Sequence, residues 1–567
     1  MQFEILLQEP DGGEFLPGGL PPEAHALAEN TEAPGTKSDT LAYADHANAI
    51  DQGWAVFYPE GRSDLLEAIS SLIALRQRQI AEKRASRHRR GPPPPIQKWA
   101  LLPNATFDAF HRGVYEQLPE PLQPRYLLIL GDLSEISVEF QQGLMASGLF
   151  VGRLCFMDDN GQHDLSAYAA YAAKVVKSEA ATVTEDPPRL LFYATRSERM
   201  HSRPDALDNG YSDFISPSFS AALNPIQELV LDRTKTALMG PRQGAGSDSW
   251  ADLLAAARSP QPSILLSLSH GAGRAGWSLE EQRAFQGRMK LSDATMLDLA
   301  DVGDRPFLPN GMWFYYACFG GGTPSESGQV AWMRKLVAAR YWLNGVDVLG
   351  TLSKSKGGFV AKQPQVALAN PDGPLAVFAH VDLAFVAAFK DYAKQHPDLP
   401  KADGEPAPGG QRALRVLGVL KTLTEGKRAG LALEALTNAA RRFDQVLLDR
   451  YKQDANLEAA VLAQIADRVS FDPNPESDAQ LAAILAAYVE ERSRVGSDRR
   501  MTMEALAEAA HMPPHRILSA FVLEQAEIQQ MEQARLSRSL NWMAREDLRG
   551  FILLGDPAVR LPIIEQP

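Results

Sequence analysis

Short apolar runs recur along this 567-residue chain as far as residue 378, and helical stretches lie between most of them. Each run is long enough for one buried strand, and residues 167–177 and 330–344 have the spacing of helices. Strands that alternate with helices predict a layered α/β/α fold with a mostly parallel sheet. The runs are Trp99–Leu102, Tyr126–Leu130, Leu149–Val151, Leu190–Tyr193, Ile264–Leu268, Met312–Tyr316, Val346–Leu349 and Leu375–Phe378.

The two ends of the chain differ from this alternating region. Residues 54–58 form one more apolar run, and residues 64–84 predict an amphipathic helix that ends in a basic, proline-rich loop. Residues 412–548, after a Pro- and Gly-rich boundary, carry a helical pattern with almost no strand signal. The apolar run at residues 551–554 then predicts a strand that returns to the sheet, which makes the helical block an insertion.

These patterns predict four regions. Residues 1–185 form an N-terminal α/β unit, and residues 186–400 form a second α/β unit. Residues 401–548 form an all-helical insertion, and residues 549–567 supply the final strand of the second unit's sheet.

The composition excludes several classes of protein. Two cysteines, Cys155 and Cys318, are too few for a disulfide scaffold or a zinc site built from thiolates. The net charge of −13 is opposite to the basic balance typical of nucleic-acid-binding proteins. The sequence begins without the pattern of a signal peptide, and no segment reaches about 18 uninterrupted apolar residues. We expect a cytoplasmic protein with neither a nucleic-acid nor a membrane partner.

The most informative motifs are Ser269-His270-Gly271 and Ala317-Cys318-Phe319, the second followed by three glycines. Each motif directly follows an apolar strand. Because the carboxyl ends of parallel strands share one edge of a sheet, we expect His270 and Cys318 to lie near each other. A thiolate is a nucleophile, and a nearby imidazole can generate it and protonate a leaving amine. The amides of Gly271 and Cys318 would then form an oxyanion hole.

Each of these residues also has a simpler explanation. A cysteine after an aromatic strand is usually a buried core residue, and a histidine at a strand end is usually a structural hydrogen-bonding residue. The joint pattern leaves catalysis and these structural explanations both open. Catalysis requires that the sulfur and the imidazole face each other across a glycine-lined notch. We assign Cys155, within a strand-like run, to the core.

Residues 271–276, Gly-Ala-Gly-Arg-Ala-Gly, also match the dinucleotide fingerprint and keep an NAD(P)-dependent oxidoreductase as an alternative. The context is poor, because a capping box of Ser278 and Glu281 predicts a helix that begins after the glycines. His511 and His515 have prolines between them and no third ligand, and residues 503–523 only faintly resemble a helix-turn-helix. We therefore expect neither a cofactor nor a metal ion.

The His270 and Cys318 motifs resemble those of the caspase-like (clan CD) cysteine peptidases, in particular the gingipain-type branch. The histidine precedes the cysteine by about 50 residues, the separation found in caspases. Further segments resemble that branch in the same order along the chain. They are residues 126–132 (YLLILGD), 151–154 (VGRL), 171–179 (YAAKVVKSE) and 551–561 (FILLGDPAVRL).

The resemblance implies a gingipain-like α/β fold and a thiol endopeptidase of bacterial type, with residues 186–400 as the catalytic subdomain. His270 would be the acid and base, Cys318 the nucleophile, and Gly271 and the Cys318 amide the oxyanion hole. By position alone, Asp213 would be a carboxylate that orients the histidine. Residues 323–328 and 353–359 would line the substrate pocket.

The substrate would be a protein or peptide, and the helical insertion, which the resemblance does not cover, would bind a regulatory protein. A catalytically inactive, peptidase-like binding module remains the other alternative.

Overall fold

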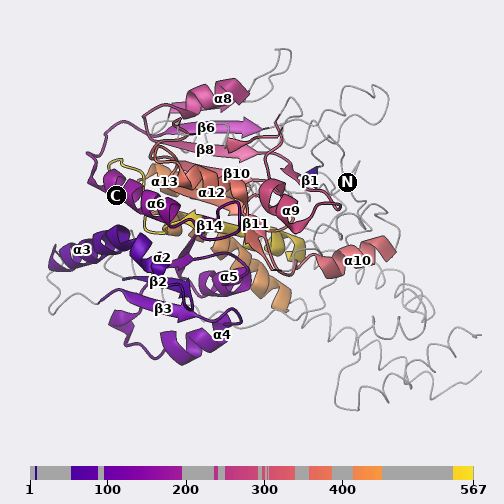
Figure 1. Cartoon of the computed structure of the whole chain (residues 1–567), viewed down its shortest axis with the longest axis horizontal. Helices are drawn as coiled ribbons and strands as arrows, with labels where there is room; N and C mark the ends of the chain where they lie inside the picture. Colours follow the sequence, from indigo (N-terminus) through magenta and orange to yellow (C-terminus); the bar gives the residue numbers. More distant parts are fainter. Residues whose placement is uncertain are drawn as a thin grey trace, which may run out of the picture.

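The computed structural model describes residues 7–8, 53–86, 95–194, 235–239, 250–291, 296–299, 303, 305–338, 357–385, 413–449 and 541–565. These residues form an α/β protein around one ten-stranded sheet (Figure 1). The strand order is β3-β2-β4-β5-β14-β13-β10-β8-β6-β7. The ten strands are β2 (Trp54–Pro59), β3 (Gln97–Leu101), β4 (Tyr126–Leu130), β5 (Phe150–Leu154), β6 (Arg189–Ala194), β7 (Lys235–Met239), β8 (Ser263–Leu268), β10 (Met312–Tyr316), β13 (Ala376–His380) and β14 (Phe551–Gly555).

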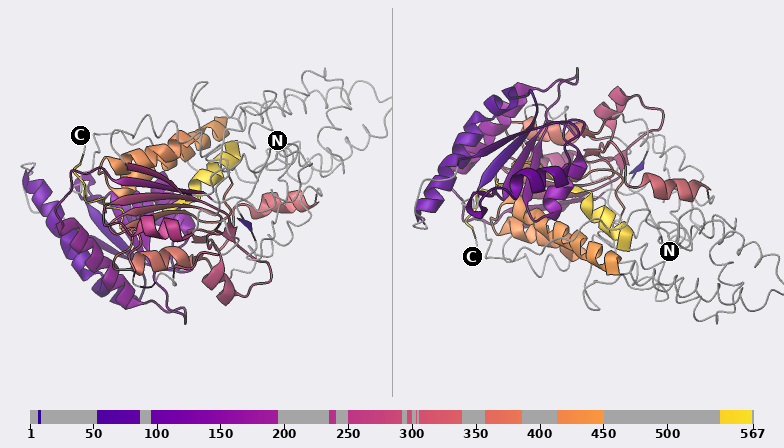
Figure 2. Two further views of the ribbon diagram at one scale, coloured as in Figure 1. Left: turned by 90° about the horizontal axis from the view of Figure 1, so that it is seen from above. Right: turned by 90° about the horizontal axis from the view of Figure 1, so that it is seen from below.

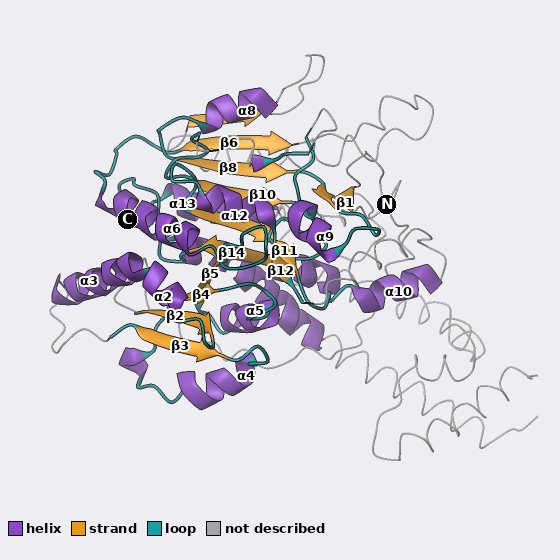
Figure 3. Cartoon of the chain, viewed as in Figure 1, coloured by secondary structure: helices purple, strands orange, loops and turns teal. Residues whose placement is uncertain are grey.

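Parallel pairing dominates the sheet. The strands β3, β2, β4 and β5 are parallel neighbours, and so are β13, β10, β8, β6 and β7. The strand β14 lies between these two groups and runs antiparallel to β13, and it meets β5 where Leu554 pairs with Arg153. The arrows of β3, β6 and β8 point the same way (Figure 3).

The carboxyl ends of both groups meet at one edge of the sheet. Asp132 follows β4, and its Oδ1 accepts a 2.7 Å hydrogen bond from the amide of Val360. Val360 belongs to a two-stranded sheet of β11 (Gly322–Thr323) and β12 (Phe359–Val360), and β11 lies just beyond the carboxyl end of β10. This edge therefore carries the loops that follow the two groups of strands.

Helices cover both faces of the sheet. The helix α13 lies on one face, and α6 and α12 lie on the other (Figure 2). The helices are α2 (Asp64–Ala68), α3 (Ser70–Ser86), α4 (Phe107–Phe110), α5 (Val138–Ala146), α6 (Leu165–Ala180), α8 (Trp250–Ala257), α9 (Leu279–Phe285), α10 (Val330–Ala338), α12 (Lys362–Ala369) and α13 (Ala413–Thr424), with further helical residues at 429–449 and 541–549. None of the helices in the described part of the chain is both long enough and apolar enough to cross a membrane.

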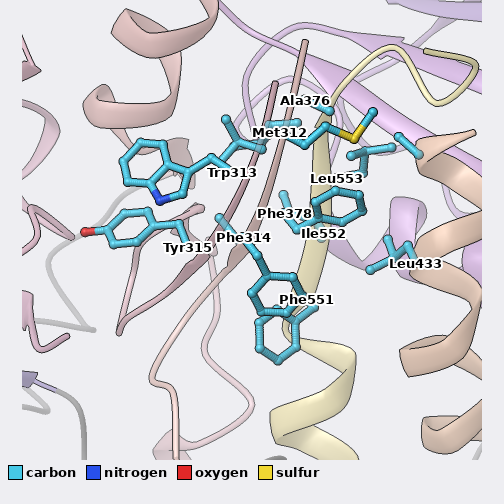
Figure 4. Packing of buried hydrophobic residues seen from close by; sticks show 14 of the residues in the cluster. Met312, Trp313, Phe314, Tyr315, Ala376, Phe378, Leu433, Phe551, Ile552 and Leu553 are labelled. Carbon is cyan, nitrogen blue, oxygen red and sulfur yellow. The ribbon is translucent and has the colours of Figure 1, made fainter. Parts of the chain in front are cut away.

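Aromatic side chains pack together in the core where β10, β13 and β14 lie side by side. Phe314 of β10 contacts Phe378 of β13 and Phe551 of β14, with ring centroids 6.0 and 5.2 Å apart (Figure 4). Leu433, from the helical residues 429–449, is buried in the same cluster. Burial of such side chains contributes about 1.5–3 kcal/mol each. The first described helices after residue 412 are therefore part of the core of the sheet.

The structure confirms the layered α/β arrangement with a mostly parallel sheet. The predicted strands at residues 54–58, 99–102, 126–130, 149–151, 190–193, 264–268, 312–316, 375–378 and 551–554 are present, and the predicted strand at 346–349 lies outside the described residues. The single helix predicted over residues 64–84 is wrong in one respect, because it breaks at Ile69 into α2 and α3. Ser70 and Ser71 follow the break, and serine competes for backbone hydrogen bonds within helices.

Candidate active site

The structure places His270 and Cys318 at matching positions beyond two neighbouring strands. Leu268 of β8 pairs with Tyr316 of β10 in parallel register, and each candidate residue follows two positions later. Adjacent strands lie about 4.8 Å apart. The expectation that both residues lie at the carboxyl edge of one sheet is therefore met in the fold.

The two backbones touch at Gly271. A Cβ atom at this position would lie closer than 3.0 Å to the carbonyl oxygen of Cys318, so no side chain fits. Phe319, directly after the cysteine, has a positive φ of 57°, which is unusual for a residue other than glycine. This close approach and tight turn bring the backbone of the histidine loop against that of the cysteine loop.

The sulfur of Cys318 is buried and held by Ala384. The residue has 0% of its surface exposed. Its Sγ accepts a hydrogen bond from the Ala384 amide at 3.2 Å and donates to the Ala384 carbonyl oxygen at 3.4 Å. Because β13 lies on the side of β10 away from β8, these contacts come from the side opposite the histidine strand. In this structure the sulfur is thus closed off among packed residues, which is the placement expected of an ordinary core cysteine, and not exposed in an open notch.

The covering segment, residues 381–385, is fixed by Asp547 in the helical residues 541–549. One oxygen of the buried Asp547 carboxylate accepts the Phe385 amide at 2.7 Å, and the other accepts the Tyr316 hydroxyl at 3.0 Å. The same hydroxyl contacts the carbonyl oxygen of Phe385. Asp547 therefore ties the segment that covers Cys318 to the strand that carries it.

Asp382 is a half-buried acid within the covering segment. Its carbonyl oxygen accepts the Phe319 amide at 2.8 Å, and its amide donates to Gly322 at 3.1 Å. Its φ of 79° is left-handed, a conformation that costs about 1–3 kcal/mol where the surroundings impose it. Burial raises the pKa of Asp382 to about 7. The acid lies next to the cysteine loop, and this strained residue holds that loop through backbone hydrogen bonds.

His270 lies in a buried environment that disfavours its charged form. Only 3% of the residue is exposed. Burial, with a smaller contribution from the positive charge of Lys290, lowers the pKa of His270 to about 4. The imidazole is therefore neutral in this form near pH 7.

A short strand pairs beside the histidine. The strand β9 (Gly271–Ala272) is parallel to β1 (Leu7–Gln8), with Leu7 opposite Gly271 and Gln8 opposite Ala272. Extended backbone from near the start of the sequence therefore occupies this edge of β9.

The structure brings together the described parts of the two predicted pocket loops. The strands β11 and β12 pair antiparallel, and the Ser325 hydroxyl accepts the Gly358 amide at 2.8 Å. Thr323 also accepts a 2.7 Å hydrogen bond from the side chain of Gln286. Residues 353–356 of the second loop lie outside the described residues.

The dinucleotide alternative gains no support from the geometry. Gly271 and Ala272 form β9, and α9 begins only at Leu279, with the predicted capping box of Ser278 and Glu281 present. The glycines therefore do not lie at a helix N-terminus, where a pyrophosphate would bind. Within the described ranges, no three His, Cys, Asp or Glu side chains gather in a way that could hold a metal ion.

The remaining sequence predictions fare differently. Cys155 is buried, as predicted, and burial raises the pKa of its thiol well above the usual value. Asp213, His511, His515 and the faint helix-turn-helix at residues 503–523 lie outside the described residues.

Sequence reasoning missed Lys290, Ala384 and Asp547. A lysine two residues before a serine, an alanine in an apolar run and an acid in a charged helix carry no distinctive local signal.

Comparisons with protein-family models, with curated proteins and with solved structures found no match to this chain. The candidate site must therefore be judged on its geometry and on the sequence resemblance.

Proposed function

We propose that the protein is a gingipain-like cysteine endopeptidase that uses Cys318 as its nucleophile and His270 as its acid and base. The observation that carries this proposal is the matched placement of the two residues beyond β8 and β10, with their backbones in contact at Gly271. The ordered sequence resemblance to caspase-like peptidases points to the same pair of residues.

The proposed reaction proceeds in two halves. The thiol of Cys318 gives its proton to His270, and the sulfur attacks the carbonyl carbon of a peptide bond. The amides of Gly271 and Cys318 would stabilise the oxyanion. The protonated imidazole then donates its proton to the leaving amine, which leaves an acyl group on the sulfur. Water, deprotonated by His270, hydrolyses this thioester and restores the free enzyme.

Activity requires that the covering segment moves away from the sulfur. A cytoplasmic protease must be restrained, and the closed form supplies such restraint through Ala384 and Asp547. Asp547 lies next to β14, at the end of the region predicted as a helical insertion. We propose that a regulatory protein bound to that insertion controls the movement.

A binding module without catalysis is the second candidate. The complete burial of Cys318 and its hydrogen bonds to Ala384 favour this alternative, because they also describe an ordinary core cysteine. In that case the same fold would hold a peptide or protein without cleaving it.

Cleavage of a peptide library by the full chain separates the two candidates. For an endopeptidase, we expect Cys318→Ala to abolish cleavage while thermal unfolding stays cooperative, and the matched variant Cys155→Ala to retain cleavage. An iodoacetamide probe should label Cys318 faster than Cys155, and His270→Ala should slow that labelling. Cleavage retained by Cys318→Ala would refute the nucleophile, and equally slow labelling of both cysteines would favour the binding module.

A further inference from the structure

Lys290 lies directly opposite His270 in a short antiparallel pair. Gly271 pairs with Met289, and the Lys290 amide donates to the His270 carbonyl oxygen at 3.1 Å. Directly opposed residues in such a pair project to the same side, with Cβ atoms about 5 Å apart. Both residues are buried, with 4% of Lys290 and 3% of His270 exposed. The ammonium and the imidazole therefore share one poorly solvated environment.

A positive charge in such an environment opposes a second positive charge beside it. Coulomb energies between nearby charges grow as water is excluded, so the ammonium disfavours a protonated imidazole. A neutral imidazole can take the proton of a thiol, whereas a protonated one cannot.

We infer that Lys290 is a positioning residue for His270: its amide holds the main chain of the histidine, and its ammonium, on the same side of the pair, opposes a second positive charge on the imidazole. The inference rests on the proposed function, because the neutral form matters for catalysis only if His270 acts as a base. It adds to that function a basic residue that no sequence motif contains.

The described residues place other charged and titratable groups near the pair. Arg288, on the same segment as Lys290, is bound by the carboxylate of Asp298 at 2.7 Å. On β10, Tyr315 donates its hydroxyl to the carbonyl of Gly287, and Cys318 follows that strand. Since Asp298 balances the charge of Arg288, Arg288→Met is a matched control for the loss of a cation from this segment.

The test is the titration of His270 by NMR in the full-length chain. Protein labelled with ¹³C-histidine is observed, and the His270 resonance is identified by its disappearance in His270→Gln. We expect Lys290→Met to raise the titration midpoint by about one pH unit, and Lys290→Gln to do the same should the Met variant unfold. Lys290→Arg and Arg288→Met should leave the midpoint unchanged. Thermal unfolding checks that each variant is folded.

Two outcomes would overturn the inference. An unchanged midpoint in folded Lys290→Met or Lys290→Gln would show that the ammonium does not act on the imidazole. An equal rise in Lys290→Arg or Arg288→Met would show that repacking, and not charge, moves the midpoint. The titration can be measured whether or not the protein cleaves peptides. If the proposed function is wrong, the titration midpoint of His270 should still shift as expected, but no proteolysis should be detected. If the protein cleaves peptides, the low-pH side of its pH–rate profile should shift to higher pH in Lys290→Met and Lys290→Gln, together with the titration midpoint of His270. It should not shift in Lys290→Arg or Arg288→Met.

Discussion

Asp547→Asn should release the segment that covers Cys318. The carboxylate of Asp547 is fully buried and accepts hydrogen bonds from the Phe385 amide and the Tyr316 hydroxyl, and its Oδ1 lies 3.5 Å from Nε2 of His380. Asparagine has nearly the same size, so it leaves no cavity. Its amide group replaces one of the two acceptor oxygens with a group that only donates.

The structure sets the size of the effect. A hydrogen bond to a charged acceptor contributes about 1.5–3 kcal/mol, and the substitution removes one of them together with the charge. Each 1.4 kcal/mol corresponds to a factor of about ten in an equilibrium constant. If the loss falls on the closed form, an open form of residues 381–385 should become about 10–100-fold more populated.

The assay is the rate at which iodoacetamide alkylates Cys318, followed by mass spectrometry of the intact protein and of its peptides. Labelling through local opening tracks the population of the open form, so the rate should rise by about tenfold or more. The matched control is Asp556→Asn, another fully buried acid, which accepts hydrogen bonds from Trp54 and Arg76 and does not contact the covering segment. An unchanged rate in Asp547→Asn, or an equal rise in Asp556→Asn, would refute the role of Asp547 as the anchor.

Two further predictions test the geometry around this segment. Gly271→Ala should destabilise the fold by about 1–3 kcal/mol, because the methyl group of the alanine would collide with the Cys318 carbonyl oxygen. An unchanged melting temperature would show that the two backbones do not touch. Burial raises the pKa of Asp382 from 3.8 to about 7, so its contribution to stability is complete below about pH 4 and is lost as the pH rises toward 7. Asp382→Asn should therefore gain stability relative to the wild type between pH 4.5 and pH 7.5 in urea denaturation, and a constant difference would contradict the assigned titration.

The sequence is most informative where one strong local signal decides the structure. The apolar runs at residues 264–268 and 312–316 are buried strands, as predicted, because runs of five residues have the length of a strand and are too short for a buried helix. The rule that parallel strands end at a shared edge then places His270 near Cys318 without any coordinates. The capping box at Ser278 is likewise local, and it limits how far the glycine motif can be interpreted as a nucleotide site.

The surroundings of the sulfur could not be predicted in this way. Ala384 meets Cys318 through its backbone amide and carbonyl, which every residue carries. Asp547 reaches the site from more than 200 positions further along the chain, and Lys290 reaches it only because a turn pairs it with His270. Such contacts depend on tertiary packing, and a pattern of residue types does not encode them. For the same reason, the apolar run at 551–554 predicts a strand but not its position between β5 and β13.

The position of β14 also limits how the candidate site can open. Its residues are buried and lie between β5 and β13, and Asp556 at its end is fixed by Trp54 and Arg76. Moving the strand would break the pairing of the two halves of the sheet and expose buried charge, a change that costs several kcal/mol. Residues 381–385 are held by hydrogen bonds and by the burial of Val381, Leu383, Ala384 and Phe385 in the core. The left-handed backbone of Asp382 stores strain that opening would release. Exposing Cys318 with the sheet intact would therefore require this segment to leave the core, and Asp547 is a side chain that ties it to β10.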